Sequence, residues 1–275
     1  MFGKIKRNRD NQKGVKCHSK YILRGVRQMI IKQPSKKLNN YQIIHAIGGS
    51  ELNFKQSVGE EVYRQSLNKI LNALNIEPKQ VHHGNQVHGA NVEIVNADKG
   101  EHPLFAGYPL SPETDGFITA EAGVAILVRM ADCTPIVIYD PISKVIAALH
   151  SGWRGTVQKI SQQAIVKMVN HFGTDVSDLI AYVGPSIDQE HYEVGSEVYE
   201  AFEAIGNRDR YFKAKGDKYI LDMIQANIEV LKLAGVKIEN IDFSTESTFV
   251  SERLHSARKE GKDYQLNALL VMLPS

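Results

Sequence analysis

Cysteine is scarce in this chain, which has two among 275 residues, Cys17 and Cys133. The first lies in a basic N-terminal segment and the second in an apolar middle region, so no structural disulfide is expected. This usage fits a reducing compartment, and we expect a cytoplasmic protein. The sequence also lacks a run of about 20 apolar residues, which a membrane-spanning helix needs, and the apolar segment of a secretory signal peptide. These absences exclude disulfide-stabilised secreted scaffolds and transmembrane proteins from the expected classes.

The net charge of +2 hides an uneven distribution. Residues 1–28 carry nine Lys or Arg and one acid, Asp10, which gives this segment +8 and the rest of the chain −6. Such a basic segment is able to bind nucleic acid or an anionic membrane surface. It lacks apolar periodicity and interleaved aromatics, however, so we expect a disordered leader, or sequence upstream of a natural start at Met29. We assign residues 29–275 to one catalytic domain without a nucleic-acid or membrane partner.

The hydrophobic pattern predicts an α/β fold, a single layered domain with a central mixed β-sheet flanked by helices. Short runs of Val, Ile and Leu predict buried strands at 116–119, 124–130, 135–139, 145–149, 180–183 and 266–272, with further extended segments at 41–46, 81–88 and 90–95. Helical spacing predicts helices over 60–75, 196–205 and 220–234. Turn residues at 140–144 predict a hairpin, 98–112 is expected to be a loop, and 151–155 a tight turn after which Thr156 caps a helix reaching 172.

Three side chains that bind metals lie at the ends of expected extended segments: His88, Cys133 and His150. Two imidazoles and a thiolate suit zinc, and three protein ligands leave a fourth position for water or substrate, as in catalytic zinc sites. The residues alone leave an alternative open. A lone cysteine in an apolar β region is more often a small buried hydrophobe, and a lone histidine is more often a hydrogen-bonded structural residue.

Several motifs occur in a set order and together resemble one known family. They are Gln86-Val87-His88-Gly89, Thr114-Asp115-Gly116, Ala131-Asp132-Cys133-Thr134-Pro135, His150-Ser151-Gly152-Trp153-Arg154-Gly155-Thr156, and Gly184-Pro185-Ser186-Ile187 followed by Tyr192-Glu193-Val194-Gly195. From about residue 41 to 273 the chain resembles the YfiH family, also called the laccase-domain or polyphenol-oxidase-type family. The resemblance implies a zinc site formed by His88, Cys133 and His150. It also implies phosphorolysis of purine nucleosides (adenosine, inosine, guanosine and methylthioadenosine), with adenosine deaminase as a companion activity.

Two segments depart from the family pattern, and each departure removes an arginine. Many members carry Thr-Arg before the Gly-Gly turn, where this chain has His45-Ala46-Ile47 before Gly48-Gly49. Near the C-terminus, Ser256-Ala257-Arg258-Lys259-Glu260-Gly261 resembles the family's Ser-Tyr-Arg-Arg-Asp-Gly, but the Thr-Gly-Arg that follows is replaced by Asp263-Tyr264-Gln265. We therefore expect phosphate affinity or substrate preference to differ from the family's, whereas the metal ligands are all present.

The implied reaction needs cations to hold phosphate, and a guanidinium group is a planar bidentate donor suited to this task. Arg154, which follows His150, is the first candidate for a phosphate clamp, Arg258 is the second and Arg129 a weaker one. Helix N-terminal N–H groups near Thr156 are able to add to anion binding. The alternative for any single arginine is a surface ion pair.

Other motif residues have candidate roles beside the metal. Asp132, next to Cys133, is a candidate either to move a proton in deamination or to orient a ligand imidazole. We expect Asp132, Cys133 and Arg154 to be catalytic. Asn85 and Gln86 are candidates to bind the purine edge, although such residues more often satisfy turns. Trp153 is a candidate to stack on a base or to pack under its turn.

Two other functions compete with a zinc-dependent phosphorylase. A copper polyphenol oxidase, as the family's older name suggests, needs many paired histidine ligands, and His82-His83 is the only adjacent pair among the ten histidines. A non-catalytic binding module would keep the metal for stability alone. The oligomeric state is not predicted.

Overall fold

The computed structural model describes residues 30–98 and 100–274, so the predicted leader over residues 1–28 lies outside the described residues. None of the helices within these two ranges has the length and apolar character needed to cross a membrane.

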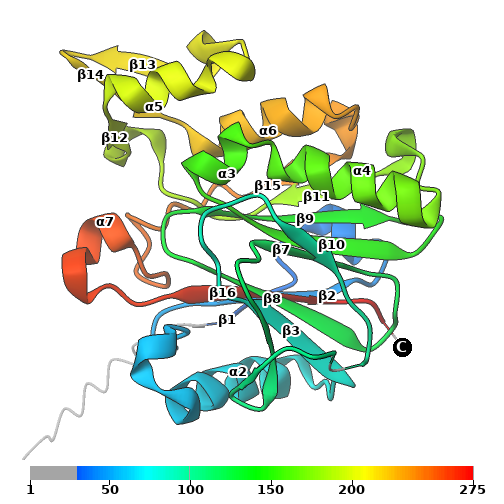
Figure 1. Cartoon of the computed structure of the whole chain (residues 1–275). Helices are drawn as coiled ribbons and strands as arrows, with labels where there is room; N and C mark the ends of the chain where they lie inside the picture. Colours follow the sequence, from blue (N-terminus) through cyan, green and yellow to red (C-terminus); the bar gives the residue numbers. More distant parts are fainter. Residues whose placement is uncertain (1–29, 99, 275) are drawn as a thin grey trace, which may run out of the picture.

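Two large mixed β-sheets lie face to face (Figure 1). The first has the strand order β1 (Ile30–Lys32), β2 (Ile44–Gly48), β16 (Asn267–Met272), β8 (Val124–Met130), β3 (Gln80–Gly84), β6 (Tyr108–Ser111) and β5 (Leu104–Phe105). The second has the order β15 (Ile241–Phe243), β11 (Ile180–Val183), β9 (Thr134–Asp140), β10 (Val145–Ser151), β7 (Gly116–Thr119) and β4 (Val92–Ile94). The predicted α/β class with mixed sheets is confirmed, and the strands divide between two sheets rather than forming one.

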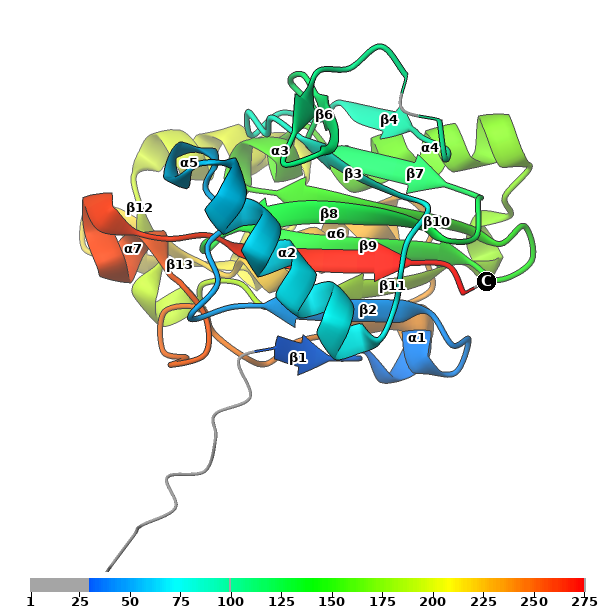
Figure 2. The same cartoon turned by 90° about the horizontal axis from the view of Figure 1, so that it is seen from below.

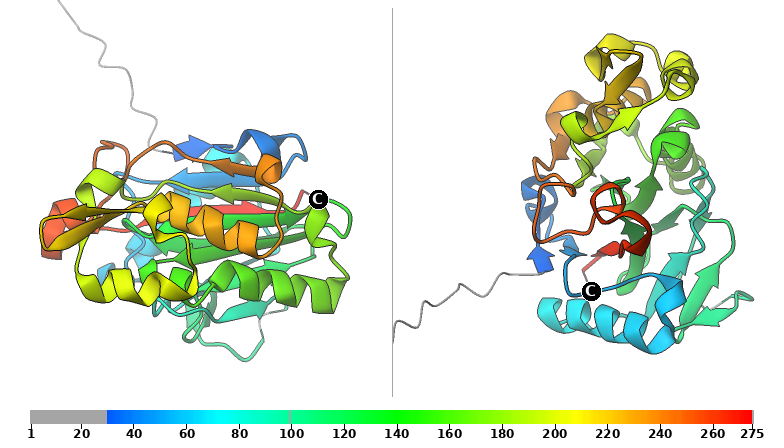
Figure 3. Two further views of the ribbon diagram at one scale, coloured as in Figure 1. Left: turned by 90° about the horizontal axis from the view of Figure 1, so that it is seen from above. Right: turned by 90° about the vertical axis from the view of Figure 1, so that its left-hand side faces the viewer.

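Helices cover the outer faces of both sheets, as Figures 1 and 2 show. Helix α2 (Glu60–Leu74) packs on the first sheet, whereas α4 (Ile160–Phe172) and α6 (Met223–Leu233) pack on the second. The remaining α-helices within the described ranges are short: α1 (Lys36–Asn39), α3 (Trp153–Val157), α5 (Ser196–Ala201) and α7 (Ala257–Glu260). The molecule is therefore layered helix, sheet, sheet, helix. The right-hand view of Figure 3 shows this stacking from the side, and the left-hand view shows α4 and α6 from above, in front of the sheets.

Side-chain alternation along the central strands produces three apolar layers. In β8, Ile126 and Val128 face the second sheet, whereas Ala125 and Leu127 face α2. Every residue of β8, β9 and β10 is buried, because these strands are covered on both faces. This explains their nearly continuous apolar sequence. The predicted hairpin is confirmed, since β9 and β10 pair antiparallel in a register that places Val145 opposite Asp140.

A smaller lobe lies beyond the second sheet. Its three strands have the order β12 (Glu193–Val194), β14 (Lys218–Leu221) and β13 (Phe212–Lys215), and α5 packs beside them. Its core combines aliphatic residues with the aromatic residues Phe202, Tyr211 and Phe212, and Trp153 and Tyr192 pack against that core. The lobe therefore adjoins the segments that follow His150 and precede β12.

Three local predictions are wrong. Residues 98–112 contain the hairpin of β5 and β6 instead of a structureless loop. The segment 151–155 is not a tight turn, because Gly152 is the N-cap of α3, and Thr156 lies inside this helix with its hydroxyl donating to the Gly152 carbonyl (3.0 Å). The helix predicted from residue 220 begins at Met223, since the Asp222 carboxylate caps it by accepting the Gln225 N–H (2.9 Å).

Candidate metal centre and adjoining pocket

His88, Cys133 and His150 come together in space, with their ligand atoms all within 4.8 Å of one another. His88 lies in the connection from β3 to β4, Cys133 in the connection from β8 to β9, and His150 in β10. Because His150 pairs with Pro135 across the β9–β10 hairpin, the register brings His150 close to the residue two positions before Pro135, which is Cys133. The hairpin therefore positions two of the three side chains.

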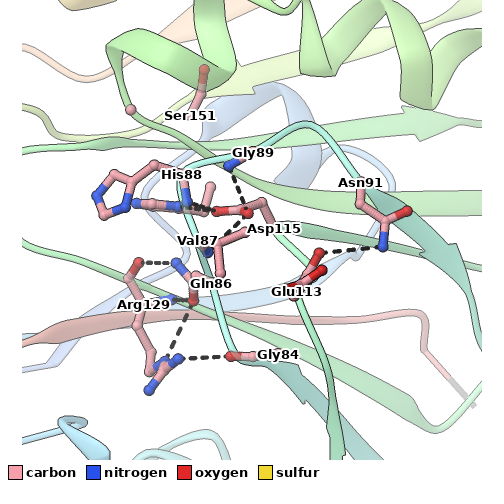
Figure 4. Close-up of polar contacts among 12 residues, drawn as sticks. Gly84, Gln86, Val87, His88, Gly89, Asn91, Glu113, Asp115, Arg129 and Ser151 are labelled. Carbon is pink, nitrogen blue, oxygen red and sulfur yellow. Dashed lines mark hydrogen bonds and ion pairs between the residues drawn. The ribbon is translucent and has the colours of Figure 1, made fainter.

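The third side chain is fixed by a buried carboxylate, Asp115 (Figure 4). Asp115 is 0% exposed and accepts three backbone N–H groups, from Val87 (3.1 Å), His88 (3.0 Å) and Gly89 (2.9 Å). These bonds hold the loop while His88 adopts a left-handed backbone conformation with φ 61°. The backbone of a non-glycine residue is strained in that region, and the three hydrogen bonds to the Asp115 carboxylate offset the strain energy.

Asp115 also orients His150. Its Oδ1 lies 2.7 Å from Nδ1 of the imidazole, and both groups are buried. A carboxylate on one ring nitrogen fixes the tautomer and leaves the other nitrogen available to a metal ion. Asp115 stands in the motif Thr114-Asp115-Gly116, but no pattern in the sequence predicts its contact with His150.

The group favours the ionised thiol. Burial opposes ionisation of Cys133, but the nearby imidazoles of His150 and His88 outweigh it and lower the pKa of the thiol to about 6. For His150, burial also opposes the charged form, but Cys133 and Asp115 outweigh it and raise the pKa. A thiolate is the form of cysteine that binds metal ions.

Gly152 permits this close approach. A Cβ atom at this position would lie 2.9 Å from Sγ of Cys133 and 2.9 Å from Cδ2 of His88. Any larger residue would therefore displace two of the three ligand side chains. Two imidazoles, a thiolate, a carboxylate behind one imidazole and a glycine in front of the group together fit a bound zinc ion.

His88, Cys133 and His150 are among the residues that line a pocket of about 350 Å³. Its other walls come from the segment after β2, the start of the His88 loop, the end of β8 and the segment around α7; the lining residues are Lys55, Gln56, Ser57, Asn85, Gln86, Arg129, Met130, Ala131, Ala257, Tyr264 and Leu266. No aspartate or glutamate is among them. The pocket is therefore cationic as well as adjacent to the candidate metal centre.

The predicted substrate residues Asn85 and Gln86 have different surroundings. Asn85 is exposed and lines the pocket. The Gln86 amide is bonded to Arg129, because its oxygen accepts the Arg129 backbone N–H (2.8 Å) and its nitrogen donates to the Arg129 carbonyl (2.7 Å), as Figure 4 shows. Gln86 is therefore engaged with β8 and has little capacity left for a purine.

Both carboxylate oxygens of Asp132 accept hydrogen bonds from other residues of the protein. Oδ1 accepts the Thr248 hydroxyl (2.6 Å) and Oδ2 accepts the backbone N–H of Arg258 (2.7 Å). Its own backbone has φ 82°, a left-handed conformation. These contacts fix the turn that carries Cys133 and the start of α7, whereas the carboxylate that meets a ligand imidazole is Asp115.

Arg154 and Arg258 lie outside the lining of this pocket. Arg154 is exposed and its guanidinium stacks on Trp153, 4.3 Å from the ring centroid. Arg258 lies 5.3 Å from the Tyr192 ring centroid and donates to the Glu193 carbonyl (3.1 Å). Trp153 thus packs between Arg154 and the core of the small lobe.

Tyr192, which sequence reasoning left without a role, lies among these charged groups. Burial raises the pKa of its phenol, the negative charges of Cys133 and Asp132 add to this, and the two arginines Arg258 and Arg154 oppose it. The phenol therefore keeps its proton near the candidate metal centre. Only the motif containing Tyr192, and no chemical pattern, marked it in the sequence.

Comparison with known families supplies the context for this site. A family model described as "Multi-copper polyphenol oxidoreductase laccase" matches residues 44–273. A purine nucleoside phosphorylase of Bacteroides thetaiotaomicron is 36% identical over 151 residues, which are 54% of this chain and 56% of the relative. A purine nucleoside phosphorylase of Deinococcus radiodurans is 38% identical over 171 residues, 62% of each chain. An adenosine deaminase, RL5, from an unknown prokaryotic organism is 39% identical over 155 residues, which are 54% of this chain and 57% of the relative. The matched region thus spans less than two thirds of these relatives.

Solved structures show the same fold. The YfiH protein of Bacillus licheniformis superposes with a TM-score of 0.78 at 22% identity, covering 84% of this chain and 93% of the other. YlmD of Geobacillus stearothermophilus also gives 0.78, at 24% identity, covering 85% of this chain and 92% of the other. The layered arrangement of two sheets and their helices is therefore shared with both proteins.

Proposed function

The chain belongs to the family described as multi-copper polyphenol oxidoreductase laccase, and we propose that it is a zinc-dependent purine nucleoside phosphorylase. The observation that carries this proposal is the grouping of His88, Cys133 and His150 in the lining of a cationic pocket. A three-ligand metal centre leaves a coordination position for a reactant, and a cationic pocket suits phosphate. The names of the relatives, several of them purine nucleoside phosphorylases, support the same reaction.

Zinc suits the donor set better than a cluster of copper ions. Two imidazoles and one thiolate are typical zinc ligands. Among the described residues, one group of His, Cys, Asp and Glu side chains has the spacing to hold a metal ion. A multicopper oxidase needs several such groups, so the hypothesis of a polyphenol oxidase has no structural support in the described part of the chain. Cys133 is a free cysteine, and reduced thiols are typical of the cytoplasm, so we propose a cytoplasmic location.

A few residues of this chain would share the tasks that phosphorolysis requires. A zinc ion bound here would supply Lewis-acid polarisation of a reacting oxygen. Asp115 holds the His150 imidazole and the His88 loop in place, and Asn85 is free to bind the purine edge. The leaving purine needs a proton or a hydrogen-bond donor. We assign this role to Tyr192, whose ring centroid lies 5.3 Å from the Arg258 guanidinium and whose buried phenol keeps its proton.

Deamination of adenosine is a companion activity that the relative named adenosine deaminase RL5 supports. In this reaction water would attack C6 of the purine instead of phosphate attacking C1′, and a proton would have to move to the C6 amine, which leaves as ammonia. Asp132 is close to Cys133, but both its oxygens accept hydrogen bonds from Thr248 and Arg258. We therefore assign Asp132 to positioning the Cys133 turn and α7.

Metal analysis and a nucleoside assay test the proposal together. Purified protein is loaded with zinc and incubated with inosine or adenosine, with and without phosphate, and products are separated by chromatography. We expect free purine and ribose 1-phosphate only when phosphate is present. A Cys133→Ala variant that stays folded should lose both zinc and activity. Phosphate-independent purine release, or no release by fully zinc-loaded protein, would overturn the proposal.

A further inference from the structure

We propose that Arg129 and Lys55 form the oxyanion subsite of the pocket, where the tetrahedral phosphate group of a reactant is held beside His88 and Cys133. This inference rests on the proposed function for the identity of the reactant, but the subsite itself is built from observed contacts.

Arg129 is a buried cation without a carboxylate partner among the described residues. It is 6% exposed, and its guanidinium donates to the Gly84 carbonyl (2.7 Å), the Phe54 carbonyl (3.4 Å) and the Gln86 side-chain oxygen (3.4 Å). A guanidinium has five N–H groups, so these three contacts leave donors unused. Burying a charge without an opposite charge is costly, and an anion in the pocket would remove that cost.

The arginine is also held in a fixed relation to the metal ligands. Gln86 bonds the Arg129 backbone on both its N–H and its carbonyl sides, and His88 is two residues further along the same loop. Figure 4 shows this pairing beside the His88 and Asp115 contacts. Gln86 therefore acts as a positioning residue, and the guanidinium and the candidate metal centre share one rigid support.

Lys55 adds a second cation to the same pocket. Its ammonium lies 3.6 Å from the centroid of the Tyr264 ring, and the described residues offer it no ion pair. A cation–π contact holds the ammonium in place without neutralising its charge. Burial and then the charge of Arg129 lower the pKa of His83 to about 4, so this imidazole stays neutral.

The two other candidate arginines lack this arrangement. Arg154 and Arg258 are exposed, each lies over an aromatic ring, and neither lines the pocket. Arg129, by contrast, lies level with Gly48 across the first sheet, since both pair with Ala268 of β16. Arg129 of β8 and Gly48 of β2 thus lie on either side of β16, two strands apart in the first sheet.

Phosphate binding and phosphate kinetics test the subsite separately. Binding of inorganic phosphate to the zinc-loaded protein is measured by titration calorimetry, without nucleoside. The Michaelis constant for phosphate is measured with inosine in excess. The variants are Arg129→Gln, Arg129→Lys and Lys55→Gln. The matched control is Lys79→Gln, because Lys79 precedes β3, is exposed to solvent and forms an ion pair with Glu121. Thermal unfolding and zinc content show whether each variant remains intact.

We expect Arg129→Gln to weaken phosphate binding and raise the phosphate KM by about tenfold to a hundredfold, as loss of charged hydrogen bonds does. Lys55→Gln should give a smaller change in the same direction, Arg129→Lys a partial recovery, and Lys79→Gln none. If Arg129→Gln and Lys55→Gln both fold, keep zinc and bind phosphate as the unmodified protein does, the subsite is wrong even when phosphorolysis is observed. If phosphate binds and the variants abolish binding but no nucleoside is cleaved, the subsite stands and the proposed function fails.

Discussion

Oδ1 of Asp115 lies 2.7 Å from Nδ1 of His150, and the same carboxylate accepts the backbone N–H of His88. One buried side chain thus controls the ring of one candidate metal ligand and the loop of another. The geometry of the metal centre depends on a residue that does not itself touch the metal position.

Replacing this carboxylate by an amide tests that dependence. Asp115→Asn keeps the size of the side chain but removes the negative charge and one acceptor, so the His150 ring and the His88 loop lose their fixed orientation. We expect zinc affinity to fall about tenfold to a hundredfold, the usual effect of losing such an outer contact. Competition with a chelator of known affinity measures it. Asp217→Asn, an exposed change, is the control, and equal zinc affinity in the two variants would contradict the prediction.

Gly152→Ala should also damage the centre, by steric displacement. The added Cβ would lie 2.9 Å from both the Cys133 sulfur and the His88 ring. We expect lower zinc affinity and lower activity while the protein stays folded, because both side chains are able to move toward the pocket. The control is Gly195→Ala, where the three atoms nearest to an added Cβ all belong to the flexible Glu197 carboxylate. The zinc content of each variant is measured after dialysis. Full retention of zinc by Gly152→Ala would show that the close approach of residue 152 to Cys133 and His88 does not affect the metal centre.

Tyr192→Phe removes a protonated hydroxyl and keeps the ring that packs against the small lobe. If the phenol assists departure of the purine, kcat should fall about tenfold to a hundredfold, a common range for the loss of a proton donor. The phosphate KM should change little, because phosphate is held by other groups. Steady-state kinetics with inosine at several phosphate concentrations separates the two constants. A variant with normal kcat would remove Tyr192 from the mechanism.

Buried His83 should make folding stability depend on pH. Burial, with the charge of Arg129, lowers the pKa of His83 to about 4, against 6.5 in the unfolded chain. Below pH 6.5 the unfolded chain takes up a proton that the folded protein refuses, so stability falls as the pH falls from 6.5 toward 4. The loss from this residue alone is about 2 kcal/mol at pH 5.

Urea unfolding at pH 7.5 and pH 5 measures that loss. The His83→Gln variant, which keeps a polar group near the Tyr63 hydroxyl, should show a smaller decrease between the two pH values. The decrease should not vanish, because burial also lowers the pKa of His45 and His82. An identical decrease in variant and unmodified protein would mean that His83 is protonated in the folded state.

Much of the fold follows from local sequence patterns. The strands of the core, such as 124–130 and 145–149, are apolar because layers cover both of their faces, and that requirement is visible in the sequence. Helix α2 was equally clear from the spacing of Leu67, Ile70 and Leu71, which all face the first sheet. The division into two sheets was not predictable, because it depends on which strands pair and not on the composition of any one strand.

The site was less predictable than the fold. The turn residues at 140–144 predicted a hairpin, but its register, which brings Cys133 close to His150, became known only from the structure. The position of His88 depends on Asp115, which follows it by 27 residues. The cationic pocket depends on Arg129 and Lys55, which come from separate segments. Arg154, the leading sequence candidate, stands beside the ligand His150 in the chain, but α3 begins at Trp153 and carries its side chain away from this pocket.

The connections between the two sheets carry two of the three candidate metal ligands. His88 lies where the chain passes from β3 in the first sheet to β4 in the second, and Cys133 where it passes from β8 to β9. An ion held by both, and by His150, would act as a cross-link between the halves of the sandwich. Its binding free energy would then be added to the cohesion of the two sheets. Loss of the ion would loosen the end of the sandwich that carries the pocket, so the occupied centre would stabilise the same architecture that creates it.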